Sequence, residues 1–174
     1  MMTAQMNISV KIVAVIGLVL GAVFGMAGTF VATRNLQAAS WAIDGVGLIV
    51  ATALLALQFF RKGNDIVAAG FLVFACASSV MLIGTATNLE GSVPSFGAGT
   101  ALWCAALLLT SIPKGFAIWV RIVGIIGSIL FATTAARIFW GERLLPTSSP
   151  LPFFAYPFLV LTFIGWIWTL LKAA

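Results

Sequence analysis

Six apolar stretches of roughly 20 residues each constrain this chain of 174 residues more than any other feature of its sequence. An α-helix rises about 1.5 Å per residue, so a stretch of this length crosses a bilayer hydrocarbon core about 30 Å thick. The alternating segments of about ten residues that build membrane β-barrels are absent from the sequence. The sequence therefore predicts an all-α integral membrane protein, because helices satisfy their own backbone groups inside lipid.

The polar interruptions between these stretches set the expected helix boundaries. We expect one transmembrane helical domain over residues 1–174, with its helices arranged as three consecutive helical hairpins in one bundle. The six spans are expected at residues 8–31, 38–60, 66–87, 96–112, 116–139 and 153–171. Turn-forming residues such as Gly63, Gly91 and Pro94 lie in the connections.

Composition excludes several classes of function. Hydrophobic residues make up 62% of the chain and charged residues 7%, which leaves too little polar surface to cover a soluble domain. The chain has no histidine, which removes histidine-ligated haem and most zinc sites, and Cys76 and Cys104 cannot hold a metal alone. Because its nine basic residues are scattered, the chain has no basic stripe for nucleic acid. We expect no cofactor, no metal and no nucleic-acid partner.

Basic residues are distributed unequally between the two sides of the predicted bundle. Three lie on one side and six on the other, the latter being Lys11, Arg61, Lys62, Lys114, Arg121 and Lys172. Since cytoplasmic loops carry the excess of lysine and arginine, we expect both termini in the cytoplasm. The expected location is a cell's inner or plasma membrane.

Asp44 lies inside the second apolar stretch, where an unpaired carboxylate costs a few kcal/mol on insertion scales, about 2.5–3.5. Arg137 in the fifth span is expected at nearly the same depth, and Arg34 lies at the outer end of the first span. Either guanidinium could offset the desolvation of the carboxylate. We therefore expect an intramembrane ion pair of Asp44 with Arg137, with Arg34 as the second candidate.

A small and polar face runs along the second span. Gly47, Ala51 and Gln58 follow Asp44 on roughly the same side of the helix at 100° per residue. Such a face is expected to meet protein or water rather than lipid. It predicts either a helix–helix seam, which we favour, or a narrow route for a solute or ion.

Gly17, Gly21 and Gly25 recur at four-residue spacing in the first span. Three glycines in register remove side chains from one stripe, so the backbone of another helix can approach closely. The stripe predicts close helix packing. Its partner is expected in the same chain or in a second copy.

Three classes of function are compatible with these features. The first is a structural or accessory membrane component, whose partners would be the lipid bilayer and either further copies of the chain or a larger membrane complex. The second is a small-solute or ion transporter or channel subunit that uses the polar face of the second span. A membrane-embedded enzyme comes last, because acid–base catalysis usually needs a second positioned group beside Asp44.

The predicted orientation can be tested by cysteine labelling in intact cells. A cysteine replacing Ser92 should react with a membrane-impermeant thiol reagent added outside, because that connection is expected on the side with fewer basic residues. A cysteine replacing Asn64 should be protected. Protection at the first position with reaction at the second would reverse the orientation.

Overall fold

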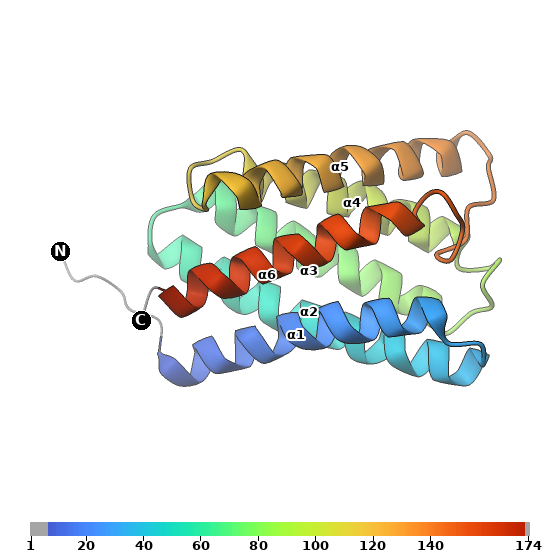
Figure 1. The fold of residues 1–174 in the computed structure, drawn as a ribbon, viewed down its shortest axis with the longest axis horizontal. Coiled ribbons are helices and arrows are strands. Elements are labelled where there is room, and N and C mark those ends of the chain that lie inside the picture. The colour runs from blue at the N-terminus through green and yellow to red at the C-terminus, as the bar shows by residue number, and fades with distance from the viewer. Residues whose placement is uncertain (1–6, 173–174) are drawn as a thin grey trace.

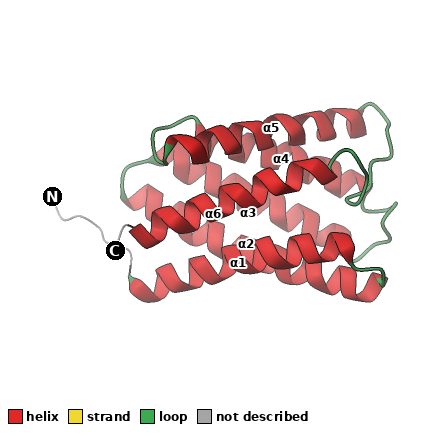
Figure 2. Ribbon diagram, in the orientation of Figure 1, coloured by secondary structure: helices red, strands yellow, loops and turns green. Residues whose placement is uncertain are grey.

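The chain folds as the expected all-α bundle. The computed structural model describes residues 7–172, and that range contains no strand. Figure 1 and Figure 2 show six long helices and a short 3₁₀ turn, η1 (Phe153–Ala155), before the last of them. The helices are α1 (Ile8–Phe30), α2 (Arg34–Arg61), α3 (Asp65–Thr85), α4 (Val93–Ser111), α5 (Ile118–Phe139) and α6 (Tyr156–Lys172).

The six helices form two layers of three. Each helix contacts its neighbours in sequence, and α6 also contacts α1, so the helices close into a ring. In Figure 1, α1, α6 and α5 lie in front of α2, α3 and α4. Consecutive helices are antiparallel, as in three hairpins. One end of the bundle, where α1 ends and α2 begins, is here called the Arg34 end; the opposite end, where α2 ends, is the Lys62 end.

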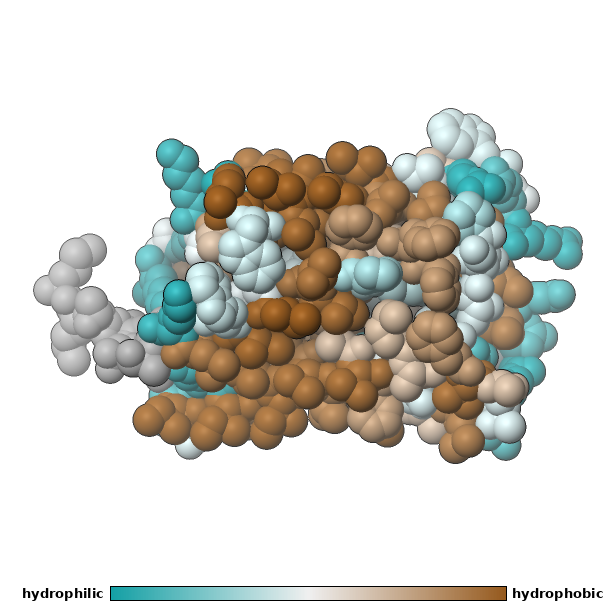
Figure 3. All heavy atoms as spheres, viewed as in Figure 1, coloured by the Kyte–Doolittle hydropathy of each residue, from teal (hydrophilic) through white to brown (hydrophobic). Residues whose placement is uncertain are grey.

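All six helices are long and apolar enough to cross a membrane, with η1 extending the last of them. Figure 3 shows a broad hydrophobic belt with hydrophilic residues gathered at the two ends of the bundle. Large aliphatic side chains such as Ile12, Val23 and Leu72 are exposed on the helices. Exposed apolar residues of this kind are suited to lipid and identify an integral membrane protein.

Helix α2 begins at Arg34, four residues before the expected start at residue 38. The polar residues 34–37, which were expected in the connection between the first two spans, form its first turn. Gln37 is buried there, and its Nε2 donates a hydrogen bond of 3.0 Å to the carbonyl oxygen of Gly28. That oxygen lies in the last turn of α1, where no backbone amide of the same helix is left to satisfy it.

The connection between α3 and α4 is also more compact than expected. Helix α4 begins at Val93, and Ser92 is buried with 7% of its surface exposed. Glu90 in the same connection is exposed. It is the better labelling position on this side for the orientation experiment.

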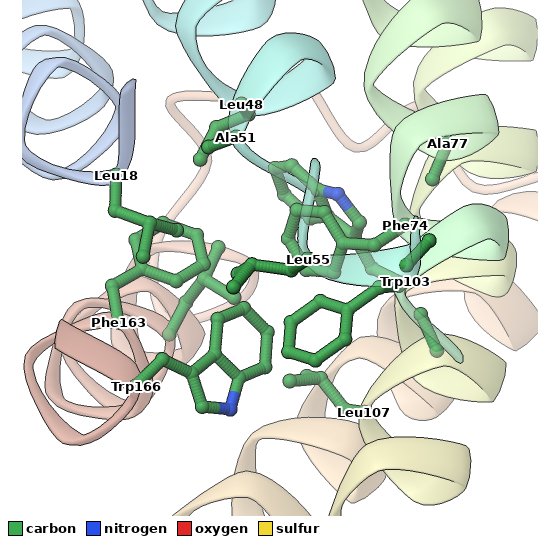
Figure 4. Packing of buried hydrophobic residues seen from close by; sticks show 14 of the residues in the cluster. Leu18, Leu48, Ala51, Leu55, Phe74, Ala77, Trp103, Leu107, Phe163 and Trp166 are labelled. Atoms are coloured by element: carbon green, nitrogen blue, oxygen red, sulfur yellow. The ribbon is translucent and has the colours of Figure 1, made fainter. Parts of the chain in front are cut away.

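Aromatic side chains fill the space between the two layers toward the Lys62 end (Figure 4). Phe71 and Trp166 meet edge to face with centroids 4.7 Å apart, and Phe74 contacts Trp166, Phe163 and Trp103. Phe71, Phe74, Phe163 and Trp166 are almost fully buried. Such pairs add about 0.5–1.5 kcal/mol each beyond their buried area. This aromatic cluster joins α3 to α6 across the bundle.

The glycine stripe of α1 packs against α2 of the same chain. A Cβ added to Gly17 would lie 2.5 Å from the carbonyl oxygen of Gly47 and 2.9 Å from Cβ of Ala51. A Cβ on Gly47 would lie 3.0 Å from the carbonyl oxygen of Gly17. The two backbones are therefore in direct contact, and side chains on both helices must be small for this approach.

The substitution Gly17→Ala should destabilise the protein by about 1–3 kcal/mol, since the new methyl group meets backbone that cannot move alone. Gly127→Ala is the matched control, because a Cβ there meets Leu107 and Phe158 at 3.5 Å, an ordinary contact. The control should be neutral or slightly stabilising, as alanine favours helix over glycine. Unfolding titrations in detergent measure both, and equal losses would contradict the close contact.

Candidate functional site

A cavity of about 110 Å³ lies between the helices in the half of the bundle nearest the Arg34 end. Residues of α1, α2, α3, α4 and α6 line it, together with the connections that follow α3 and α5. Helix α5 itself does not contribute to the lining. The cavity has room for several water molecules, since one water needs about 10–15 Å³.

Asp44 lines this cavity from α2. It lies ten residues after Arg34, which places it about 15 Å along the helix. Its carboxylate faces α1, because a Cβ added to Gly25 would lie 3.2 Å from Oδ2 and one added to Gly21 would lie 3.3 Å from Oδ1. Two glycines of the stripe therefore make room for the carboxylate. No residue from 7 to 172 forms a hydrogen bond or ion pair with it.

Arg137 has a different partner from the one expected. Its Nη2 lies 2.6 Å from Oε2 of Glu142, and its Nε donates to both carboxylate oxygens at 3.0 and 2.9 Å. The turn at Gly141, with φ +94°, returns the chain so that Glu142 meets the end of α5. Hydrogen bonding from Arg137 lowers the pKa of Glu142. The predicted Asp44–Arg137 pair is thus replaced by a local, exposed pair.

Arg34 does not pair with Asp44 either. Its Nη2 donates a hydrogen bond of 2.9 Å to the carbonyl oxygen of Thr87, in the connection after α3. Both residues line the cavity, and Arg34 is exposed. The guanidinium therefore ties α2 to the α3–α4 connection at the mouth of the cavity, and the carboxylate deeper inside keeps no cationic neighbour among the described residues.

The expected polar face of α2 is divided between two environments. Gly47 and Ala51 are buried in the contact with α1, so they belong to the seam. Gln58 is buried near the Lys62 end and is not part of the cavity lining. Of the four residues grouped on this face, Asp44 is the one that lines the cavity.

Sequence reasoning missed two polar groups of the cavity. Ser78 and Trp103 are 2% and 5% exposed, and both line it. Neither the Ser78 hydroxyl nor the Trp103 indole N–H has a hydrogen-bond partner in the described part of the chain. By contrast, the hydroxyl of the adjacent Ser79 donates to the carbonyl oxygen of Ala75 at 2.9 Å. Nothing in the linear pattern distinguishes Ser78 from Ser79.

Aromatic side chains form much of the remaining wall. Those that line the cavity are Trp41, Phe96, Trp103, Tyr156 and Phe163. Tyr156 does not bond to Asp44; its hydroxyl donates to the carbonyl oxygen of Pro146 at 2.8 Å. The phenol thus binds the α5–α6 connection beside the cavity and does not donate a hydrogen bond to the Asp44 carboxylate.

Because Asp44 and Arg137 are not in contact, their substitutions should be energetically independent. We expect the destabilisation of the double variant Asp44→Asn/Arg137→Gln to equal the sum of the two single effects. The cycle of Arg137→Gln with Glu142→Gln is the positive control, since these side chains do touch. Unfolding in detergent measures both cycles, and coupling between Asp44 and Arg137 would contradict this arrangement.

The cavity combines a carboxylate, a hydroxyl and an indole N–H within aromatic walls. Apolar walls with a few placed polar groups are the usual composition of a small-molecule site. Within the described residues, no group of three or more acidic or cysteine side chains could hold a metal ion. No family model, no curated protein and no solved structure matches this chain.

Proposed function

We propose that this chain binds a small solute in the cavity at the Arg34 end, as a solute carrier or as the solute-binding subunit of a membrane complex. The single observation that carries the proposal is the set of polar residues lining one cavity: Ser78 and Trp103, whose hydroxyl and indole N–H have no hydrogen-bond partner among the described residues, and Asp44, which has no ion pair there. Buried polar groups without partners are unfavourable, and water or a ligand in the cavity would satisfy them.

The position of the cavity supports access from one side of the membrane. Its lining includes Arg34, Thr87 and Leu89 at the Arg34 end, while the aromatic cluster around Phe71 and Trp166 fills the bundle toward the Lys62 end. A carrier that is open to one side of the membrane has this arrangement, with a cavity in one half of the bundle and a closely packed core in the other half. With both termini in the cytoplasm, as the basic residues suggest, the cavity would open away from it.

A structural or accessory role is the second candidate. The observation that favours it is the tight contact of Gly17 with Gly47 and Ala51, together with the aromatic cluster, since both serve packing. In that case the cavity would stay dry or hold only ordered water. The two roles therefore differ in whether a solute reaches Ser78 from outside.

Cysteine accessibility separates these roles. In a Cys76→Ala/Cys104→Ala background, Ser78→Cys should react with methyl methanethiosulfonate, a small uncharged reagent that modifies thiolates in water. Thr134→Cys is the matched control, because Thr134 is equally buried on α5 and does not line the cavity. We expect at least a tenfold faster reaction at position 78. Equal protection of both cysteines would overturn solute access and favour the structural role.

A further inference from the structure

We infer that the cavity selects a small protonated amine that also carries a hydrogen-bond acceptor. The inference rests on the proposed solute-binding function and specifies the chemical class of the solute. It combines three features of the cavity: an acidic side chain without a basic partner, aromatic walls, and a hydroxyl and an N–H group without acceptors.

The first feature selects positive charge. Among residues 7–172, Asp44 is the one acidic side chain in the cavity lining, and Arg34 is the one basic side chain. Arg34 is exposed at the mouth and donates to Thr87, so it does not neutralise Asp44. An ammonium group beside the carboxylate would supply the missing counter-charge and donate charge-assisted hydrogen bonds. An anionic solute would meet repulsion from the same carboxylate.

Glycines of α1 let the carboxyl group keep its place beside that helix. A Cβ at Gly25 would lie 3.2 Å from Oδ2 of Asp44, and a Cβ at Gly21 would lie 3.3 Å from Oδ1 and would overlap the side chain of Leu48. Side chains at these two positions would therefore displace Asp44 from its present position in the cavity lining.

The aromatic walls favour the same charge. Rings of Trp41, Trp103 and Tyr156 are among the lining residues, and tryptophan and tyrosine faces attract cations electrostatically. Away from the charged group, these rings suit a short apolar body. Aromatic walls thus tolerate the hydrocarbon part of an organic amine while its ammonium group meets Asp44.

The unsatisfied donors distinguish such a solute from a plain alkylamine. An indole N–H can only donate, so Trp103 needs an acceptor, and the Ser78 hydroxyl can donate as well. Trp103 lies ten residues after Val93 and Ser78 seven before Thr85, depths of about 10–15 Å from the Arg34 end, similar to Asp44. An ether, hydroxyl or carbonyl oxygen near the ammonium group would therefore meet donors at the same level.

Four small probes of nearly equal shape test the inference by isothermal titration calorimetry on the full chain in detergent. 2-Methoxyethylamine carries both groups, butylamine lacks the acceptor, 2-methoxyethanol lacks the charge, and methoxyacetate reverses it. We expect 2-methoxyethylamine to bind at least tenfold more tightly than butylamine or 2-methoxyethanol, and methoxyacetate to show no binding.

Variants assign the preference to individual groups. Asp44→Asn should reduce 2-methoxyethylamine binding at least tenfold and leave 2-methoxyethanol binding unchanged. Trp103→Phe should remove most of the difference between 2-methoxyethylamine and butylamine. Asp65→Asn is the matched control for lost negative charge, because Asp65 is exposed at the Lys62 end, and it should change nothing.

The outcomes separate this inference from the function on which it rests. If 2-methoxyethanol or methoxyacetate binds as tightly as the amine, solute binding stands and the inferred amine selectivity is overturned. Equal affinities of 2-methoxyethylamine and butylamine for the unmodified protein would show that the cavity does not recognise a hydrogen-bond acceptor on the solute. If none of the four probes binds, the inference fails, and the reactivity of Ser78→Cys then decides whether the solute-binding function fails with it. The probe series on the unmodified protein decides these points even if a variant fails to fold.

Discussion

Contact with hydrocarbon is the constraint on which the rest of this structure depends. Lipid offers no hydrogen-bond partners, so each spanning segment must satisfy its own backbone, and the helix is the form that does so within one segment. Lipid also removes most of the hydrophobic drive for helices to associate, because lipid tails are as apolar as leucine side chains. Association then depends on packing, and this protein packs in two ways: backbone against backbone at Gly17 and Gly47, and ring against ring around Phe74 and Trp166.

These two kinds of packing also shape the cavity. The glycine contact draws α1 and α2 together near Gly17, while the aromatic cluster fills the layers toward the Lys62 end. Between them and the Arg34 end, Gly21 and Gly25 lie against the Asp44 carboxyl group and line the cavity. The same stripe of small residues therefore serves as a seam at one end and as one wall of the cavity at the other. A cavity forms in this way without any break in the six helices.

Hydroxyl groups illustrate how a helix in lipid normally satisfies its polar side chains, namely by hydrogen bonds to its own backbone. Thr52, Thr110, Thr134 and Thr162 each donate to a carbonyl oxygen one turn earlier in their own helix. Ser78 does not, although it occupies a comparable position on α3. Ser78 is therefore an exception among these buried hydroxyls, and the proposed solute site depends on it.

The number, type and approximate limits of the helices could be predicted from the sequence, because the length and apolarity of a segment are local properties that the bilayer tests directly. The glycine stripe likewise predicted a close contact, although the partner helix was left open. Polar residues at helix ends were harder to assign. Residues 34–37 were expected in a linker, because the hydrogen bond of Gln37 to the carbonyl oxygen of Gly28 in α1 cannot be read from the local sequence.

Side-chain partners were decided by the tertiary structure alone. Arg137 and Asp44 were expected at nearly the same depth, but α2 begins at Arg34, so Asp44 lies about 15 Å from that end of its helix. Arg137 lies two residues before the end of α5 and pairs with Glu142, five residues away. The rotations of α2, α3 and α4 about their axes place Asp44, Ser78 and Trp103 in the lining of one cavity, and no linear pattern encodes those rotations.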